Sequence, residues 1–358
     1  MYTCRELYIP HEFDQSAYRD ASVDDSFEDH YQWEVGFIIK GKYIINRYLG
    51  EGSFGRVLEV RDLCDKKIKA MKIIKQVPEY VNEAKTEVET LKMLNSLDID
   101  HNSHIVEILD AFPFENHYCI VFEKLGRSLF SLIERNSFRG FTVNEIKDFS
   151  RQILESLNFM HKHQLTHTDL KPENILLVND QYKYCPQRKL YRPASTDVKI
   201  IDFGGATFVN DHHSTTISTR HYRAPEVILQ SGWSMSSDMW SLGCILIELY
   251  TGKMLFPLLD DYAHLALMEK LFGRFPTKMI KASGKKLKVY FNKRNQLNWP
   301  ELCGNSSDFE TVENAASIEE LIPDIDFRNF VTDILRFNPE WRPTPSEALM
   351  HRFLANDL

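Results

Sequence analysis

The sequence has few cysteines, no long apolar run and no excess of positive charge, and each of these absences excludes a class of protein. Its six cysteines are scattered over 358 residues without a Cys-x-x-Cys pair, so we expect neither a disulfide framework nor a zinc site, and a reducing compartment. Apolar runs such as residues 244–250 are too short to span a bilayer, and the acidic, polar start offers no signal peptide. We therefore expect a soluble intracellular protein without a membrane partner.

The formal net charge of the chain is −8. Direct binding of nucleic acid depends on a basic surface, so this charge argues against it. The same charge is compatible with attraction of a basic substrate. A chain of 358 residues is also long enough to form two packed lobes, each with its own core.

The pattern along the chain divides it into three parts. Residues 1–30 are rich in Asp, Glu and Ser, and we expect an acidic extension that is mobile or lies on the surface. Residues 31–123 contain short β-type runs and one helix expected near 79–97. Residues 124–358 are mostly helical, and residues 179–197 are polar and resemble an insertion. These patterns predict an α+β fold with a small β-rich lobe, which has one main helix, and a larger, mostly helical lobe.

A glycine-rich motif comes first among the candidate functional residues. Residues 50–57 read Gly-Glu-Gly-Ser-Phe-Gly-Arg-Val, and glycines allow backbone N–H groups to close over phosphates. Dinucleotide-binding folds share such spacing but require a helix to start there, whereas here the pattern continues as a strand. A glycine-rich hairpin over a nucleotide is favoured, and an ordinary hairpin turn is the alternative.

Lys72 lies in an apolar strand pattern, where a lysine needs a partner. A buried and unpaired lysine would cost about 3–5 kcal/mol. The helix that follows offers two candidates, Glu87 on the flank of its apolar face and Glu83 one turn earlier. A surface lysine and a solvated glutamate remain the plain alternative.

The next motifs together indicate phosphoryl transfer, which needs positioning and charge neutralisation. Within residues 165–174 we expect Asp169 to accept the proton of a substrate hydroxyl, Lys171 to neutralise the moving phosphoryl group and Asn174 to bind Mg²⁺. Asp202 ends an apolar strand before Phe-Gly and is the expected main Mg²⁺ ligand. Residues 224–226 then read Ala-Pro-Glu.

In this order the motifs resemble those of the protein kinase superfamily over about residues 36–355. The resemblance implies a two-lobed kinase fold and the cofactors ATP and Mg²⁺. It also implies that Asp238 anchors the backbone of the catalytic loop and that Arg342 pairs with Glu226.

Three features are similar to the LAMMER (CDC-like) dual-specificity branch. Residues 218–226 resemble the group that holds the cyclin-dependent, MAP and CDC-like kinases, and Thr168 replaces the arginine that most kinases carry before the catalytic aspartate. Residues 264–270 resemble the EHLAMMER signature, although Ala263, Leu267 and Lys270 stand where that signature has Glu, Met and Arg. We expect this helix to serve in packing and docking rather than in catalysis.

The resemblance assigns the remaining site residues. Phe122 is the expected gatekeeper, and Glu123 and Leu125 are expected to offer backbone groups to adenine, although plain core packing is an alternative for the apolar members. The catalytic set is Lys72, Glu87, Asp169, Lys171 and Thr219. The nucleotide set is Leu49, Gly50, Gly52, Ser53, Phe54, Gly55, Val57, Ala70, Lys72, Phe122, Glu123, Leu125, Asn174, Leu176 and Asp202, with Asn174 and Asp202 as the metal ligands.

Thr168 leads to a hypothesis about regulation. An arginine at this place pairs with a phosphate on the activation segment, so without it we expect activity that needs no upstream phosphorylation. The Ser/Thr cluster of residues 214–219 then holds either regulatory phosphosites or ordinary loop polarity. Thr219 is expected, by the resemblance, to contact both Asp169 and Lys171.

The resemblance further implies serine phosphorylation of Arg/Ser-rich splicing proteins, autophosphorylation on tyrosine, a monomer, and residence in the nucleus and also the cytoplasm. Residues 285–294 are basic and either contact phosphorylated product or form a solvated loop. The alternatives are a kinase of a neighbouring branch and a pseudokinase scaffold. A scaffold would have lost Lys72, Asp169 or Asp202, and all three are present.

Overall fold

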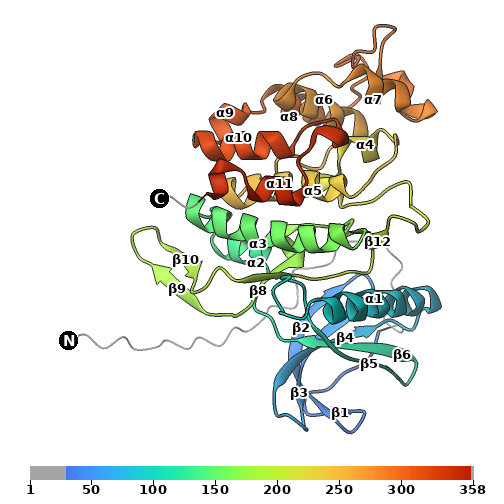
Figure 1. The fold of residues 1–358 in the computed structure, drawn as a ribbon, viewed down its shortest axis with the longest axis vertical. Helices are drawn as coiled ribbons and strands as arrows, with labels where there is room; N and C mark the ends of the chain where they lie inside the picture. Colours follow the sequence, from blue (N-terminus) through green and yellow to red (C-terminus); the bar gives the residue numbers. More distant parts are fainter. Residues whose placement is uncertain (1–29, 356–358) are drawn as a thin grey trace.

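The computed structural model describes residues 30–355, so the acidic extension predicted for residues 1–30 lies outside the described residues except for His30. Figure 1 shows a six-stranded antiparallel sheet with one long helix at one end of the molecule and a larger group of helices at the other. This arrangement confirms the predicted α+β fold with a small β-rich lobe and a larger helical lobe.

The small lobe is a curved sheet with strand order β1-β2-β3-β4-β6-β5 and the helix α1 beside it. Helix α1 packs against β4, β5 and β6, and its buried residues include Ala84, Glu87 and Val88. Alternate residues of the strands face the sheet's own core, which contains Leu58, Met71 and other apolar side chains. The bounds are β1 Ile38–Ile39, β2 Tyr43–Gly52, β3 Gly55–Asp62, β4 Ile68–Ile74, α1 Pro78–Leu97, β5 Ile108–Phe114 and β6 His117–Glu123.

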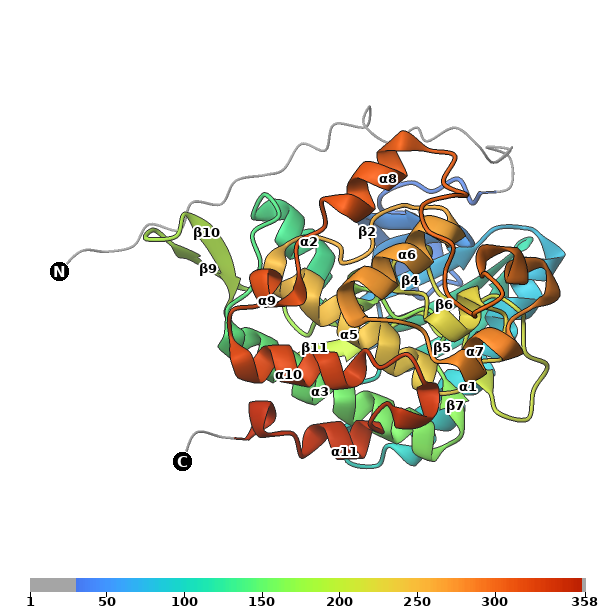
Figure 2. The same ribbon diagram turned by 90° about the horizontal axis from the view of Figure 1, so that it is seen from above.

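The large lobe is built around two long helices, α3 and α5, and Figure 2 shows the other helices arranged about them. Thr142 caps α3 in the predicted capping box with Glu145. Helix α5 is buried along almost its whole length, with Trp240 fully enclosed. The helices are α2 Leu129–Arg135, α3 Val143–Lys162, α4 Pro225–Ile228, α5 Ser236–Thr251, α6 Asp261–Phe272, α7 Thr277–Ala282, α8 Ser306–Glu313, α9 Ile318–Leu321, α10 Ile325–Ile334 and α11 Pro345–Leu349, with shorter 3₁₀ turns η2 Pro172–Asn174, η3 Arg220–Tyr222, η4 Lys285–Tyr290, η5 Pro339–Trp341 and η6 Arg352–Leu354.

Two small antiparallel pairs place the candidate site between the lobes. Strand β8 (Ile175–Leu177) pairs with β11 (Val198–Ile200), and β7 (Leu165–Thr166) pairs with β12 (Thr207–Phe208). The loop from residue 167 to 174 and the loop from 201 to 206 are therefore held side by side.

The polar insertion contains a hairpin that the sequence pattern did not indicate. Strands β9 (Tyr182–Cys185) and β10 (Leu190–Pro193) pair and project away from the large lobe, as Figure 1 shows. Tertiary contacts fix this hairpin, because the Arg135 guanidinium lies 3.8 Å from the centre of the Tyr191 ring and Asn136 bonds both the N–H and the carbonyl of Tyr191. Within residues 30–355, no helix is both long and apolar enough to cross a membrane.

Candidate active site

The glycine-rich motif is a β-hairpin, as predicted, with Gly52 paired to Gly55 across the turn. The two glycines have different reasons to lack a side chain. A Cβ on Gly55 would lie 2.1 Å from the Ile73 carbonyl oxygen of β4, so close strand packing demands glycine there. A Cβ on Gly50 or Gly52 would meet nothing within 4 Å, so their backbones are open on the side of the cleft. Ser53 and Phe54 form the exposed turn, and the Phe54 ring contacts Tyr80 of α1 edge-on at 5.2 Å.

Lys72 of β4 pairs with Glu87 of α1. Their Nζ and Oε2 atoms are 2.9 Å apart, and a carboxylate oxygen of Asp202 lies 3.5 Å from the same Nζ. Burial alone would lower the pKa of Lys72, but attraction from Glu87 and Asp202 outweighs it and raises the pKa above its ordinary value. Lys72 is therefore charged and fixed in position by Glu87. Glu83 is exposed and does not pair with it.

The catalytic-loop candidates converge on Asp169. Its Oδ2 lies 2.7 Å from Lys171 Nζ, and its Oδ1 accepts hydrogen bonds from the hydroxyl (2.8 Å) and the N–H (3.0 Å) of Thr219. Lys171 also reaches the Thr219 hydroxyl at 3.4 Å. Burial pushes the pKa of Asp169 upward, but Lys171 and Thr219 hold it below its usual range. The group thus stays ionised at neutral pH.

Asp238 fixes the backbone of this loop through hydrogen bonds to its side chain. Its side chain is 1% exposed and accepts hydrogen bonds from the N–H groups of His167 (2.9 Å) and Thr168 (3.0 Å). His161 donates a third, at 3.0 Å. This anchoring agrees with the sequence-based expectation and fixes where Asp169 points.

Asn174 and Asp202 supply an amide and a carboxylate at the same end of the cleft. Asn174 uses its Nδ2 to donate to the Asp169 carbonyl at 3.0 Å, which leaves its Oδ1 as an acceptor. Asp202 has a backbone φ of 66° and is one-third exposed, with one oxygen toward Lys72. Two oxygen donors beside a nucleotide suit Mg²⁺, which usually completes its shell with phosphates and water.

The expected walls of the nucleotide site share a distinctive burial pattern. The side chains of Val57, Ala70, Phe122 and Leu176 are only partly buried. Their chain neighbours, by contrast, are fully enclosed: Leu58, Met71, Val121, Ile175 and Leu177 are at most 1% exposed. Because successive side chains of a strand face opposite sides, the partly buried set lies on the other face of its strands from these enclosed neighbours, and Phe122 and Leu176 also pack against the core of the large lobe. Leu49 is also partly buried.

The segment after β6 approaches the same place. The N–H of Glu123 donates a hydrogen bond to the Glu107 carbonyl at 3.1 Å, and the Glu123 carboxylate lies 2.5 Å from Lys199 Nζ. Leu125 is buried, and its carbonyl accepts from the Lys124 ammonium. The roles of the Glu123 carbonyl and the Leu125 N–H in binding adenine stay predictions from the resemblance.

Hydrogen bonds from ordinary side chains hold the activation segment. The Thr168 hydroxyl donates to the Gly205 carbonyl at 2.7 Å. The Trp233 indole N–H donates to the Ser214 carbonyl at 2.7 Å while its ring stacks on His213 at 4.2 Å. Further along, Arg223 donates to the Ser218 carbonyl at 2.8 Å. Several unmodified contacts therefore order this stretch.

Two family-like features lie farther from the cleft. Arg342 and Glu226 form a bidentate pair at 2.5 and 2.6 Å, with side chains at most 1% exposed. In α6, which carries the EHLAMMER-like residues, Ala263 and Leu267 are buried, and the Lys270 ammonium bonds the Glu313 carbonyl. Helix α6 is thus a packing element.

Sequence reasoning missed two carboxylates next to the catalytic loop. Glu173, between Lys171 and Asn174, has a buried oxygen, Oε2, without a hydrogen-bond partner among the described residues. Glu248 of α5 is 4% exposed and accepts a 2.7 Å hydrogen bond from the Tyr222 hydroxyl. Burial, with a contribution from Glu173, raises the pKa of Glu248 to about 7. The available signal was a lone glutamate inside the apolar run of residues 244–250.

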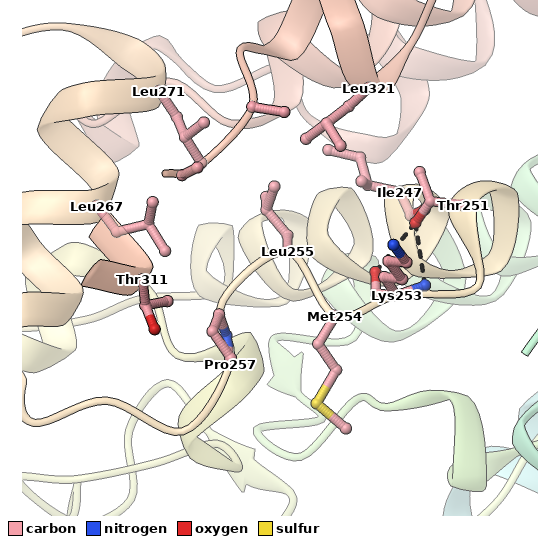
Figure 3. A pocket seen from close by; sticks show the side chains of 12 residues that line it. Ile247, Thr251, Lys253, Met254, Leu255, Pro257, Leu267, Leu271, Thr311 and Leu321 are labelled. Carbon is pink, nitrogen blue, oxygen red and sulfur yellow. Dashed lines mark hydrogen bonds between the residues drawn. The ribbon is translucent and has the colours of Figure 1, made fainter. Parts of the chain in front are cut away.

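A separate hollow of about 170 Å³ lies between α5, α6, α8 and α9 and is shown in Figure 3. Its lining includes Ile247, Leu255, Leu267 and Leu321 and none of the predicted site residues. It is not part of the candidate active site.

Comparison with known proteins agrees with this site. Residues 43–354 match the protein kinase domain family. The serine/threonine-protein kinase AFC2 of Arabidopsis thaliana is 39% identical over 348 residues, covering 93% of this chain and 81% of that protein. The dual specificity protein kinase CLK4 of Mus musculus is 41% identical over 345 residues, covering 94% and 71%. The crystal structure of the PF14_0431 kinase domain superposes with a TM-score of 0.86 at 39% identity, covering 92% and 99%.

This chain has the motifs in the expected order, the pair of Lys72 and Glu87, and the loop that holds Asp169. Its relatives are kinases, and they match nearly its whole length. The chain therefore belongs to the protein kinase family and, within it, to the LAMMER (CDC-like) branch.

Proposed function

We propose that this protein kinase phosphorylates serine and threonine in Arg/Ser-rich proteins of the splicing type, and that it can also phosphorylate its own tyrosines. As a protein kinase it uses ATP with Mg²⁺ and acts on protein substrates. The relatives bear the names serine/threonine-protein kinase and dual specificity protein kinase, and both activities are carried to this chain as part of the proposal.

In the proposed mechanism the small lobe binds and orients ATP. Lys72, held by Glu87 at 2.9 Å, neutralises the α- and β-phosphates. The open backbone at Gly50 and Gly52 lets N–H groups approach the phosphates. Phosphoryl transfer depends mainly on such positioning and charge neutralisation, because little covalent chemistry is left for the protein.

Asp169 orients the substrate hydroxyl and accepts its proton as the oxygen attacks the γ-phosphorus. The new oxygen–phosphorus bond replaces the bond to the β,γ-bridging oxygen, and ADP is the leaving group. The depressed pKa of Asp169 keeps it ionised before the reaction, and Thr219 fixes the direction of its carboxylate. Lys171 lies 2.7 Å from the same carboxylate and neutralises charge on the phosphoryl group in transit.

Asp202 and Asn174 would hold Mg²⁺. Their oxygens are hard donors of the type that this ion prefers. When bound, Mg²⁺ supplies charge neutralisation at the phosphate oxygens.

The proposed preference for arginine rests on one observation, the unpartnered buried oxygen of Glu173 beside Glu248. A buried carboxylate oxygen without a partner is costly, so a cation in this place would be stabilising. Both carboxylates adjoin the loop that carries Asp169 and Lys171. The guanidinium of a substrate arginine, with five donors in a planar fork, satisfies carboxylates better than a lysine ammonium does.

For the whole protein we propose a monomer that acts in the nucleus and also in the cytoplasm. Support for the location comes only from likeness to the LAMMER branch, and support for Arg/Ser-rich splicing proteins comes from that likeness and from Glu173. A kinase of a neighbouring branch would share the mechanism but not the requirement for arginine.

The test is phosphate transfer from ATP–Mg²⁺ to an Arg/Ser-repeat peptide, run beside the same peptide with lysine in place of arginine and beside an Asp169→Asn protein. Transfer that needs both arginine and Asp169 supports the proposal. Transfer that is indifferent to arginine removes the substrate class and keeps the kinase. Binding of ATP without transfer to any peptide would remove the enzymatic mechanism.

A further inference from the structure

The strongest charge asymmetry of the chain lies outside the active site. Residues 274–294 contain eight Lys or Arg and no Asp or Glu, in a protein whose net charge is −8. We call Lys285, Lys286, Lys288, Lys293 and Arg294 the basic segment. All five side chains are exposed.

The backbone of the basic segment is ordered, unlike that of a free loop. The 3₁₀ turn η4 is anchored by Leu287, which is 7% exposed, while Lys285, Lys286 and Lys288 point into solvent. The turn at residues 291–297 is closed by a β-bridge and by the hydrogen bond from the Asn292 N–H to the Gln296 carbonyl. The solvated cations of the basic segment are therefore carried by an ordered backbone.

The cations of the basic segment have no ion-pair partner among residues 30–355. No carboxylate of residues 30–355 lies within ion-pair distance of Lys285, Lys286, Lys288, Lys293 or Arg294. Elsewhere on the same lobe, the partly buried Arg220 and the exposed Arg352 do pair with carboxylates. The positive charge of the basic segment therefore stays available to an external anion.

The basic segment is attached to the elements that end the activation segment. The N–H of Gly284, immediately before η4, donates to the Leu229 carbonyl at 2.9 Å, directly after α4. At the other end of η4 the Tyr290 ring lies 5.0 Å from that of Tyr262 in α6. The neighbouring residue in α6, Asp261, holds Arg220 at 2.7 Å. The basic segment is thus attached to α4 and α6, and α6 also holds Arg220 of the activation segment.

We propose that the basic segment binds phosphoserines that the enzyme has already placed on a substrate polypeptide. A phosphoserine carries about −1.5 to −2 charges at neutral pH. An Arg-Ser unit is positive before the reaction and becomes negative after it. The basic segment repels the first form and attracts the second, so it recognises product rather than fresh substrate.

The role of arginine in the partner rests on the function proposed above, whereas the need for phosphate does not. A polypeptide with several serines stays near the active site after the first transfer, because its phosphorylated part is held while a new serine enters. Attraction between exposed charges is screened over about 8 Å at physiological salt, so the hold is reversible and sensitive to salt.

A nucleic acid is the other polyanion to consider. Single-stranded nucleic acids are bound by cations together with aromatic rings on which bases stack. The aromatic ring of η4, Tyr290, is partly buried and packs on Tyr262, and the large exposed apolar side chain of this turn is Val289, at 64%. The observations therefore favour a phosphopeptide.

The first experiment measures direct binding without ATP, by fluorescence anisotropy at low and at physiological salt. The probes are an Arg/Ser-repeat peptide, its multiply phosphorylated form, and a phosphoserine peptide with alanine in place of arginine. The proteins are the wild type, the reversal variant Lys285→Glu/Lys286→Glu/Lys288→Glu, and a control with the same charge change, Lys67→Glu/Lys92→Glu/Lys162→Glu, at exposed positions elsewhere.

We expect the wild type and the control to bind both phosphorylated peptides about ten-fold more tightly than the unphosphorylated one, a difference of about 1.4 kcal/mol, and the reversal variant to lose this preference. Equal preference in the reversal variant overturns the proposal. The proposal is also overturned if the control variant loses the preference for phosphorylated peptides to the same extent, because net charge alone would then explain the binding. An RNA oligonucleotide of the same charge that binds as tightly would also overturn it, in favour of a nucleic-acid surface.

The second experiment measures turnover. The reversal variant should keep the kcat/KM of the wild type on a peptide with a single serine, which shows that the active site is intact. On a substrate with many serines it should place fewer phosphates per encounter in a pulse–chase assay. An unchanged number of phosphates per encounter, with single-site activity intact, contradicts the proposal whether or not arginine proves to be required.

Discussion

The hydroxyl of Thr168 donates a 2.7 Å hydrogen bond to the carbonyl of Gly205, and this contact ties the catalytic loop to the start of the activation segment. The same stretch of backbone is strained, since Thr168 has φ of 71°. In kinases with arginine at this place, a phosphate on the segment forms the tie. Here a neutral hydrogen bond connects the loop and the segment, with support from Trp233 and Arg223.

The first prediction is that phosphatase-treated protein keeps most of its activity, because none of these contacts needs a phosphate. Thr168→Val keeps the β-branched shape but removes this hydrogen bond and leaves the Gly205 carbonyl with the Thr207 hydroxyl at 3.0 Å, a loss of about 0.5–1.5 kcal/mol. We expect kcat to fall several-fold in this variant. A peptide assay on phosphatase-treated wild type and variant checks both points, and complete loss of activity in the treated wild type would refute the first.

The second prediction concerns the partner of Lys72. Glu87→Gln leaves the lysine with Asp202 at 3.5 Å as its one remaining carboxylate. Misplacement of the ammonium by about 1 Å should lower kcat/KM by about 10²-fold. Glu83→Gln is the matched control, since this side chain is exposed on the same helix. Equal effects of the two variants in a steady-state assay would show that Glu87 has no special role.

The third prediction concerns pH. Burial raises the pKa of Glu248 to about 7, with Glu173 adding repulsion and the Tyr222 hydroxyl opposing both. The folded protein thus favours the neutral carboxyl of Glu248. The resulting contribution to the free energy of unfolding is complete when the pH is below 4.5, the ordinary pKa of a glutamate, and is lost as the pH rises through about 7.

Binding of a substrate arginine depends on pH in the opposite direction, because the arginine pairs with the charged form of the Glu248 carboxylate. The KM for an arginine-containing peptide should therefore fall as pH rises from about 6 to about 8. Asp169 does not contribute in this window, since its pKa lies below 3.8. Glu248→Gln should weaken the pH dependence and leave the part that comes from Glu173, whose pKa burial also raises. Replacing arginine in the peptide with alanine should flatten the profile. A profile unaltered by Glu248→Gln would exclude this group as the arginine partner.

The fourth prediction separates two glycines of one hairpin. Gly55→Ala forces a Cβ to within 2.1 Å of the Ile73 carbonyl oxygen, so we expect the free energy of unfolding to fall by about 1–3 kcal/mol. Gly52→Ala meets nothing within 4 Å and should unfold like the wild type, but its side chain obstructs the approach of phosphates and raises the KM for ATP. Thermal unfolding and ATP titration measure the two effects, and a destabilised Gly52→Ala protein would argue against this division.

Much of the site could be predicted from the sequence, because phosphoryl transfer requires particular residue types and these occur in short motifs that follow one another in a recognisable order. Asp169, Lys171 and Asn174 lie within six residues, so their proximity follows from local geometry. The glycine hairpin and the capping box at Thr142 are also local, and both are confirmed. The hairpin of β9 and β10 was not predicted, because its short strands are fixed by contacts with Arg135 and Asn136 rather than by their own pattern.

The sequence by itself determined the family, the fold class and the identities of the reacting groups, since each motif is a short stretch that must supply particular side chains. Only the tertiary structure decided which groups meet across long separations. It selected Glu87 over Glu83 for Lys72 and left Oε2 of Glu173, near Glu248, without a hydrogen-bond partner among residues 30–355. It also attached the basic segment to Leu229. Pairing and burial depend on how distant elements pack, and no local pattern carries that information.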